Sequence, residues 1–454
     1  MNSVPETGAA DRACLLGRAW AERGHDEAAF THLQRALALD PRHREAHRQL
    51  AHWHVRRNDF PRALEHMGKA LAEAPPESPL RQEWILLRQL AGLGQSPAEL
   101  PDQPEGKLKF RTRYDRAHHR SGWRDALEAL HPLHNAGGVL FEGFLEDPFA
   151  WQHPRDGIRS GPELLQALRS RAYETRLTSE ELHVVPFGEP WVGFLHNPAD
   201  MPDWFHYDES PQMIFAKPVW QESLRFCRGL FALSEHLACW LRKATGKPVS
   251  ALIHPTVVPA VTFDFNRFLA NPRKRIVQIG WWLRRLTAIH RLPIAADNPL
   301  RYRKLRLVPD FAPGAEAHLR ELFARECAVL GFALDPDSND VETLAHLPND
   351  AYDALLAENI VFLELHAASA NNTVIECIAR ATPLLVNPLP AVVEYLGASY
   401  PLYYTDAADA AARATDLGRL RAAHEYLLGC DIRAKLDPGY FRESFRASEV
   451  YQRL

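Results

Sequence analysis

Residues 371–397 read NNTVIECIARATPLLVNPLPAVVEYLG and set the pattern of the second half of the chain. Two asparagines and a threonine, which are typical helix-capping residues, precede a helical stretch. A small-residue–proline turn ends that stretch, and PLLVN follows as a short apolar run. The segment therefore predicts a helix followed by a strand, with Glu376 one turn into the helix and Glu394 after the strand.

The same alternation of strand and helix begins near residue 107. The candidate strands are GVLFEGF, WVGFLH, GLFALS, VSALIH, RIVQIG, NIVFLELH and PLLVN. Helical stretches such as SEHLACWLRKATG and NDAYDALLAE lie between them. This order predicts an α/β fold of parallel sheets with helices on both faces. About 340 residues exceed one such sheet, so we expect two lobes, with the seam just before RIVQIG.

The first hundred residues repeat with a period of 34. Leu16, Ala29, Ala36 and Pro41 recur as Leu50, Ala63, Ala70 and Pro75. Together with Gly17 and Trp20, this pattern resembles the tetratricopeptide family. SPLRQEWILLRQLAGLG is similar to a third unit. The resemblance implies an all-α helical array that binds a protein or peptide; a spacer or dimer contact is an equally good interpretation.

The expected domains follow from these patterns. They are 1–96 for the helical repeats, 97–108 for a proline-rich and acidic linker, 109–268 for a first lobe and 269–454 for a second lobe.

Composition narrows the classes of function. The chain has 454 residues, 46% hydrophobic and 24% charged, with a formal net charge of −4, which gives no reason to expect nucleic acid as a partner. No run approaches the roughly 18 apolar residues of a membrane span. The N-terminal stretch has no leader pattern, so we expect a cytoplasmic protein. The six cysteines form no C-x-x-C pair, which argues against a zinc site or a disulfide framework.

Ligands of open parallel sheets bind at the carboxyl ends of the strands. His196 ends WVGFLH, and Gly280 ends RIVQIG, which Arg284 and Arg285 follow closely. His196 is the best candidate for a general base, because imidazole titrates near neutral pH.

The helix starting near Asn371 is a candidate anion site, because a helix N-terminus presents unpaired N–H groups and a partial positive charge. Asn371, Asn372 and Thr373 would cap it, and the Thr373 hydroxyl would donate to a phosphate. On the same face, Glu376 would accept the hydroxyls of a ribose. Arg284 and Arg285 would neutralise a leaving diphosphate without a metal.

The motifs GLFALSEHLACWL, IVQIGWWLRR and NTVIECIARATPLLVN resemble, in this order, GT-B glycosyltransferases of the family 4 and family 1 kind. The resemblance covers roughly residues 110–454 and implies two Rossmann-like lobes that hold a nucleotide sugar between them. It implies a UDP- or GDP-linked donor with its ribose on Glu376, and no cofactor. Glu394, after the next strand, is expected to face the same cleft.

On the acceptor side we expect His196, which ends a first-lobe strand, and the loop HHRSGW with His118, His119 and Gly122, where glycine allows a ligand to approach the backbone closely. Two departures stand out: Ala368 occupies the position of a second acid found in many retaining members, and AASANN replaces a glycine-rich loop. Asn372-Thr373-x-x-Glu376 is similar to the Asn-Ser-x-x-Glu of some inverting members, so the stereochemical outcome stays open. The departures favour an alternative, an inactive scaffold whose helical repeats bind proteins. A sugar-nucleotide epimerase is a third hypothesis.

Overall fold

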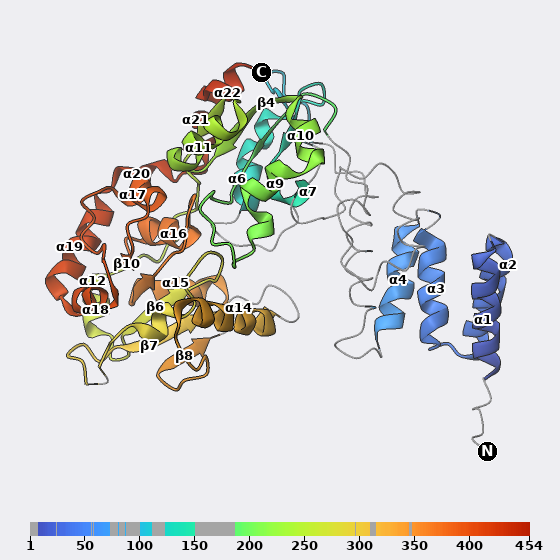
Figure 1. Ribbon diagram of the computed structural model, residues 1–454, viewed down its shortest axis with the longest axis horizontal. Helices are drawn as coiled ribbons and strands as arrows, with labels where there is room; N and C mark the ends of the chain where they lie inside the picture. The colour runs from blue at the N-terminus through green and yellow to red at the C-terminus, as the bar shows by residue number, and fades with distance from the viewer. Residues whose placement is uncertain are drawn as a thin grey trace. The chain divides into compact units, whose positions relative to one another are not determined.

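The computed structural model describes residues 8–72, 80, 87, 100–110, 123–149 and 187–454, apart from 24, 56, 58, 296, 309–314, 345 and 346. The described chain divides into two compact units (Figure 1). One contains the helices of residues 9–71, and the other contains the described residues of 101–146 and 188–454. His118, His119, Gly122 and most of the predicted third repeat lie outside the described residues.

The helical unit is built from pairs of helices that pack in sequence: α1 (Ala9–Glu22), α2 (Asp26–Leu39), α3 (Arg44–Val55) and α4 (Phe60–Leu71). Small residues sit where these helices touch, as the repeat pattern predicts. Ala29, Ala36, Ala63 and Ala70 are all buried. At Gly17, a Cβ atom would lie 2.7 Å from Leu33 Cγ, so glycine permits the close contact of α1 with α2.

One repeat position differs between the two pairs of helices. Leu50 is buried in α3, whereas its counterpart Leu16 in α1 is 51% exposed. The helix α3 packs against both α2 and α4, while α1 is the first described helix and contacts α2 and α3. The same sequence position therefore faces a neighbour in one pair and solvent in the other.

The first sheet is parallel, with the order β1-β2-β3-β4-β5. Its strands are β1 (Leu108–Phe110), β2 (Val139–Glu142), β3 (Trp191–Phe194), β4 (Cys227–Ala232) and β5 (Val249–Ala251). The prediction of four of these strands is confirmed, and β1 was not predicted. Among the described strands, spatial order follows chain order without the reversal expected of a doubly wound, Rossmann-like lobe.

Helices around the first sheet are α6 (Trp123–Leu130), α7 (Glu146–Phe149), α9 (Pro211–Ala216), α10 (Pro218–Leu224) and α11 (Glu235–Thr245). Short 3-10 turns occur at His131–Leu133 and Tyr207–Glu209. Ser234 caps α11, because its Oγ accepts the N–H of Leu237 at 3.3 Å.

The second sheet is also parallel and has the order β10-β9-β6-β7-β8. Its strands are β6 (Arg275–Ile279), β7 (Arg303–Leu307), β8 (Val341–Leu344), β9 (Ile360–Leu363) and β10 (Leu384–Val386). The chain adds β7 and β8 on one side of β6, then returns to add β9 and β10 on the other. This reversal creates a topological switch point between β6 and β9, where ligands of such sheets bind. Every residue of β9 and β10 is buried, as expected of strands covered on both faces.

Helices around the second sheet are α12 (Phe265–Ala270), α13 (Ala288–Arg291), α14 (Ala315–Leu330), α15 (Asn349–Ala357), α16 (Asn372–Arg380), α17 (Pro390–Leu396), α18 (Ala407–Thr415), α19 (Leu417–Leu428) and α20 (Asp431–Lys435). The predictions of α15 and α16 are confirmed. No helix in the described part of the chain has the length and apolar character that crossing a membrane requires.

The two cores show that the predicted lobe boundaries need correction at both ends. Phe265 and Phe268 of α12 pack in the core of the second sheet, although they precede the predicted boundary at 268/269. The last helices, α21 (Pro438–Ala447) and α22 (Glu449–Gln452), return to the first sheet, where Phe445 and Tyr451 join its core. Figure 1 shows α21 and α22 beside the helices of the first sheet. The segment 269–454 is therefore not one lobe.

Candidate functional site

The loops that follow β6 and β9 meet at the switch point of the second sheet. Two backbone hydrogen bonds join them. The N–H of Arg285 donates to the carbonyl of Glu364 at 2.8 Å, and the N–H of His366 donates to the carbonyl of Leu283 at 2.9 Å. Leu283 has φ 56°, a left-handed conformation that costs a non-glycine residue energy and that clusters at functional sites.

Gly280 ends β6 and has φ 77°. A Cβ atom here would lie 2.9 Å from both Cζ and Nε of Arg284. Glycine is therefore required twice, once for the backbone conformation and once for the close approach of the guanidinium group. The predicted importance of Gly280 has a physical basis in the placement of Arg284.

Arg284 reaches the start of α16. Its Nη2 donates to Thr373 Oγ1 at 3.0 Å and to Asn371 Oδ1 at 3.3 Å, while Nη1 donates to the carbonyl of Trp282 at 2.8 Å. Burial lowers the pKa of Arg284 to about 10, and the nearby Tyr352 and Glu376 act in the opposite direction. The group remains a cation at neutral pH.

The start of α16 matches the predicted cap. Asn371 Oδ1 accepts the N–H groups of Thr373 at 3.0 Å and Val374 at 3.3 Å, and Asn372 is the first residue of the helix. A cation next to the positive end of a helix is unfavourable unless an anion lies nearby. Arg284 and the α16 N-terminus together thus form a place of concentrated positive charge, suited to a phosphate or carboxylate group.

Glu376 lies one turn into α16 with its side chain 1% exposed. The hydroxyl of Tyr352, on α15, donates a hydrogen bond to Glu376 Oε2. Burial and the carboxylate of Glu376 both raise the pKa of Tyr352, which keeps it a donor. Arg380 and Asp353 pair at 2.5 Å, with the Arg380 guanidinium 5.5 Å from the centre of the Tyr352 ring. No sequence pattern near Glu376 indicated Tyr352, because Tyr352 lies on another helix, α15.

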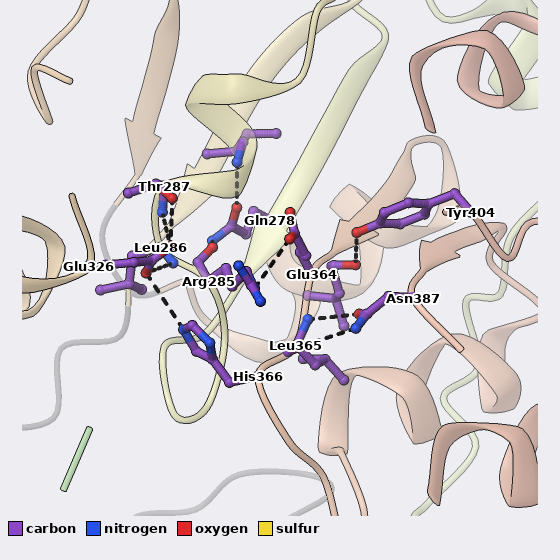
Figure 2. Close-up of polar contacts among 12 residues, drawn as sticks. Gln278, Arg285, Leu286, Thr287, Glu326, Glu364, Leu365, His366, Asn387 and Tyr404 are labelled. Carbon is purple, nitrogen blue, oxygen red and sulfur yellow. Dashed lines mark hydrogen bonds and ion pairs between the residues drawn. The ribbon is translucent and has the colours of Figure 1, made fainter. Parts of the chain in front are cut away.

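The structure places the two predicted arginines differently. Arg285 does not reach α16 in the way Arg284 does; its Nε lies 3.2 Å from Glu364 Oε1 in an ion pair (Figure 2). Gln278, in β6, donates to the carbonyl of Arg285 at 3.1 Å and accepts the N–H of Ile289 at 3.0 Å. Arg285 and Gln278 thus hold the loop after β6 against the β9 side.

A buried carboxylate holds the same loop from α14. Glu326 accepts the N–H of Leu286 at 2.8 Å and the hydroxyl of Thr287 at 2.5 Å, and its Oε2 lies 3.8 Å from His366 Nε2 (Figure 2). Although burial alone would raise it, the pKa of Glu326 is lowered by the nearby His366 ring and by the hydrogen bonds from Thr287 and the backbone. Glu326 therefore fixes the loop as an anion.

The loop after β9 is fixed from the other side (Figure 2). Asn387 accepts the N–H of Leu365 at 2.8 Å and donates to its carbonyl at 3.0 Å. The Tyr404 hydroxyl donates to the carbonyl of Leu363 at 2.7 Å. Gln278, Glu326, Asn387 and Tyr404, for which no sequence pattern predicted a role, thus hold the two loops at the switch point together with Arg285.

The loop between β9 and α16 also contacts the first lobe. Ser369 Oγ donates to the carbonyl of His196, the residue that follows β3 and Leu195. The His196 ring stacks on Phe144 at 3.9 Å between centroids and meets Trp123 edge-on at 4.5 Å. Ala368, next to Ser369, is buried in the core of the second sheet. The structure thus brings the predicted base close to the loop that leads to α16.

Glu394 does not lie with this group. Its Oε1 accepts the N–H of His236 and its Oε2 the N–H of Glu235, both at 2.6 Å, at the start of α11. The carboxylate is occupied by the first turn of a helix of the first lobe instead of facing the predicted donor. Among the described residues, no three His, Cys, Asp or Glu side chains gather as metal ligands.

No protein-family model matches the chain, and no curated protein matches its sequence. Among solved structures, an α,α-trehalose-phosphate synthase (UDP-forming) from Burkholderia vietnamiensis matches with a TM-score of 0.46 at 15% identity, over 76% of this chain and 99% of that one. A mutant O-GlcNAc transferase from Thermobaculum terrenum matches with a TM-score of 0.41 at 13% identity, over 97% of this chain and 89% of that one. HepE from Anabaena, in complex with UDP-glucose, matches with a TM-score of 0.45 at 12% identity, over 75% of this chain and 98% of that one.

Proposed function

We propose that this chain is a glycosyltransferase that moves a sugar from a nucleotide-sugar donor to an acceptor. The observation that carries the proposal is the meeting of the Arg284 guanidinium with the N-terminus of α16 at the switch point of the second sheet. Two sources of positive charge converge there, and a diphosphate is the anion that such a place binds well.

The donor would lie along α16. Its diphosphate would accept hydrogen bonds from Arg284 and Thr373, so that part of the charge developing on the leaving group is neutralised by the protein instead of a metal. Its ribose would compete with the Tyr352 hydroxyl for Glu376, because that hydroxyl covers the carboxylate in this structure. Arg285, paired with Glu364, would contribute less than Arg284.

The acceptor would approach from the first lobe. His196 follows β3 at the carboxyl edge of the first sheet, and Ser369 connects its backbone to the loop before α16. A base in this position would take a proton from the acceptor hydroxyl.

A protein or peptide partner for the helical unit is the second part of the proposal. A groove of about 840 Å³ lies between α2, α3 and α4. Its lining combines apolar side chains such as Phe30 and Leu37 with the charged Arg35 and Glu65. That mixture suits an extended peptide with both apolar and charged groups.

Calorimetry with UDP-, GDP-, ADP-, CMP- and dTDP-sugars tests the donor site. One nucleotide family should bind the wild type and raise its apparent thermal stability. Arg284→Met should weaken that binding by about 1.5–3 kcal/mol, the usual range for a hydrogen bond to a charged group, which is roughly 10- to 150-fold in Kd.

Two further variants sharpen this test. Glu376→Gln should also lower affinity, because an amide replaces the carboxylate that would accept the ribose hydroxyls. Arg285→Met is the matched control, since Arg285 neighbours Arg284 but pairs with Glu364; it should have the smaller effect. Absence of binding by every nucleotide sugar at millimolar concentration would refute the donor site and favour a scaffold with the helical unit as its binding part.

A further inference from the structure

Glu146 is a buried acid that the proposed reaction has not yet used. It begins α7, shortly after β2, and its side chain is 0% exposed. Its Oε1 accepts the N–H groups of His196 at 2.6 Å and Asn197 at 2.7 Å. Its Oε2 lies 3.3 Å from His196 Nδ1. Because β2 and β3 are parallel neighbours, their carboxyl ends place the acid and the histidine side by side.

The chemistry of the carboxylate determines which ring nitrogen of His196 carries the proton. An ionised carboxylate only accepts hydrogen bonds, so its contact with Nδ1 requires a proton on that atom. Nε2 then presents its lone pair. Nε2 is buried and has no hydrogen-bond partner among the described residues. A buried polar atom without a partner costs free energy, which a ligand hydroxyl at this position would recover.

The surroundings of Glu146 favour a role beyond holding the backbone. Oε2 of Glu146 contacts the His196 ring, and the nearby Glu209 has its pKa raised by burial and, to a smaller degree, by Glu146. A buried negative charge of this kind is costly. It becomes favourable when the imidazole ring turns into a cation, as happens when a histidine accepts a proton during catalysis.

We propose that Glu146 is a positioning residue that keeps His196 in the Nδ1–H form, so that Nε2 accepts the proton of an acceptor hydroxyl. This inference rests on the proposed function. As the hydroxyl proton passes to Nε2, the acceptor oxygen forms the new bond to the anomeric carbon. The bond from that carbon to the diphosphate oxygen breaks, and its electron pair leaves with the nucleoside diphosphate. Glu146 stabilises the imidazolium and does not itself gain the proton.

Glu146→Gln tests this role, because glutamine has nearly the same shape but a different hydrogen-bonding pattern. Its amide oxygen would keep the two backbone N–H groups, while its NH₂ group would face Nδ1 and donate to it. The ring proton should then move to Nε2. The ¹⁵N spectra of the histidine rings distinguish the two forms and need no substrate, so this measurement is independent of the proposed function.

The kinetic measurement follows the release of nucleoside diphosphate from a nucleotide sugar that binds, with water as the acceptor. Glu146→Gln should lower kcat by about 10²- to 10⁴-fold, the range for losing a general base. The KM for the donor should stay the same, because Glu146 does not touch the α16 site. Glu209→Gln is the matched control: Glu209 Oε1 lies 3.4 Å from His206 Nδ1, so it should change neither the His196 form nor kcat.

The outcomes separate the two proposals. If no nucleotide sugar binds the wild type, the proposed function fails, and this inference fails with it. If donors bind but wild-type His196 carries its proton on Nε2, the inference alone is overturned. The same holds if Glu146→Gln moves the proton and leaves kcat unchanged. The wild-type spectrum alone shows which ring nitrogen of His196 carries the proton, so the test remains valid even if Glu146→Gln folds poorly.

Discussion

At the scale of single residues, Gly280 is the position on which the anion site depends most directly. Its backbone is left-handed, and Arg284 lies against the face where a side chain would begin. Any other residue must either shift the loop or push the guanidinium away from Thr373 and Asn371. The site therefore depends on the lack of a Cβ atom at Gly280 as much as on the charge of Arg284.

Gly280→Ala should lower nucleotide-sugar affinity and also destabilise the fold by about 1–2 kcal/mol, the penalty of a left-handed conformation for a residue with a Cβ atom. Gly246→Ala is the matched control. Gly246 has φ 66°, and nothing lies within 4 Å of the position of its Cβ atom. It should show a similar loss of stability in urea unfolding and no change of affinity in calorimetry. Equal affinities for the two variants would contradict the role of Gly280.

At the scale of elements, α17 joins the two lobes. The Tyr395 hydroxyl donates to the carbonyl of Leu233 at 2.8 Å and accepts the N–H of His254 at 3.0 Å. Glu394 takes the first two N–H groups of α11, and Ser234 takes the third. A single turn of a second-lobe helix thus satisfies backbone groups at the carboxyl ends of β4 and β5.

Tyr395→Phe should cost more stability than Glu394→Ala, although the latter removes a charge. Tyr395 is buried, and its loss leaves two backbone groups without partners, worth about 1–3 kcal/mol. Glu394 is exposed, so water can replace it, and the loss should be about 1 kcal/mol, as for other helix caps. Urea midpoints at constant m-value provide the comparison. The reverse ranking would show that the Tyr395 bridge does not form in solution.

The elements that sequence predicted are those whose signals are local. The Asn371 cap and the apolar runs of β9 and β10 are visible within a few residues. The strands β7 and β8 were missed because charged residues interrupt their apolar pattern. Lys304, in β7, is buried, with its charge paired to Asp340 and its Nζ 3.3 Å from two backbone carbonyls. A strand with a satisfied buried lysine has no recognisable pattern in the sequence.

The site shows the same division between local and distant contacts. Arg284, Asn371 and Thr373 follow from strand ends and helix starts, which the sequence displays. Tyr352 and Glu146 do not, because each acts on a residue that only the fold brings near, across 24 and 50 positions of the chain. The direction of Glu394 toward α11 likewise depends on how the lobes meet, which no local pattern encodes.

At the scale of the whole molecule, the chain crosses between the lobes and ends on the first one. Phe445 of α21 is 0% exposed and stacks on Phe231 of β4 at 4.4 Å between ring centroids. Lys107, just before β1, donates to the backbone carbonyl of Tyr451 in α22 at 3.3 Å. The core of the first lobe therefore includes residues of α21 and α22, which follow the second lobe in the sequence.

Phe445→Ala should destabilise the first lobe by about 3–5 kcal/mol, the usual cost of removing a buried aromatic side chain. Tyr440→Ala, on the same helix, removes a ring that is 42% exposed and should change stability by about 0.5 kcal/mol or less. Hydrogen exchange of peptides from β3 and β4 locates the effect: Phe445→Ala should speed their exchange more than that of β9 and β10. Faster exchange of β9 and β10 would instead place α21 with the second lobe, as the predicted domain boundary at 269–454 had it. The assignment of α21 to the first lobe would then be wrong.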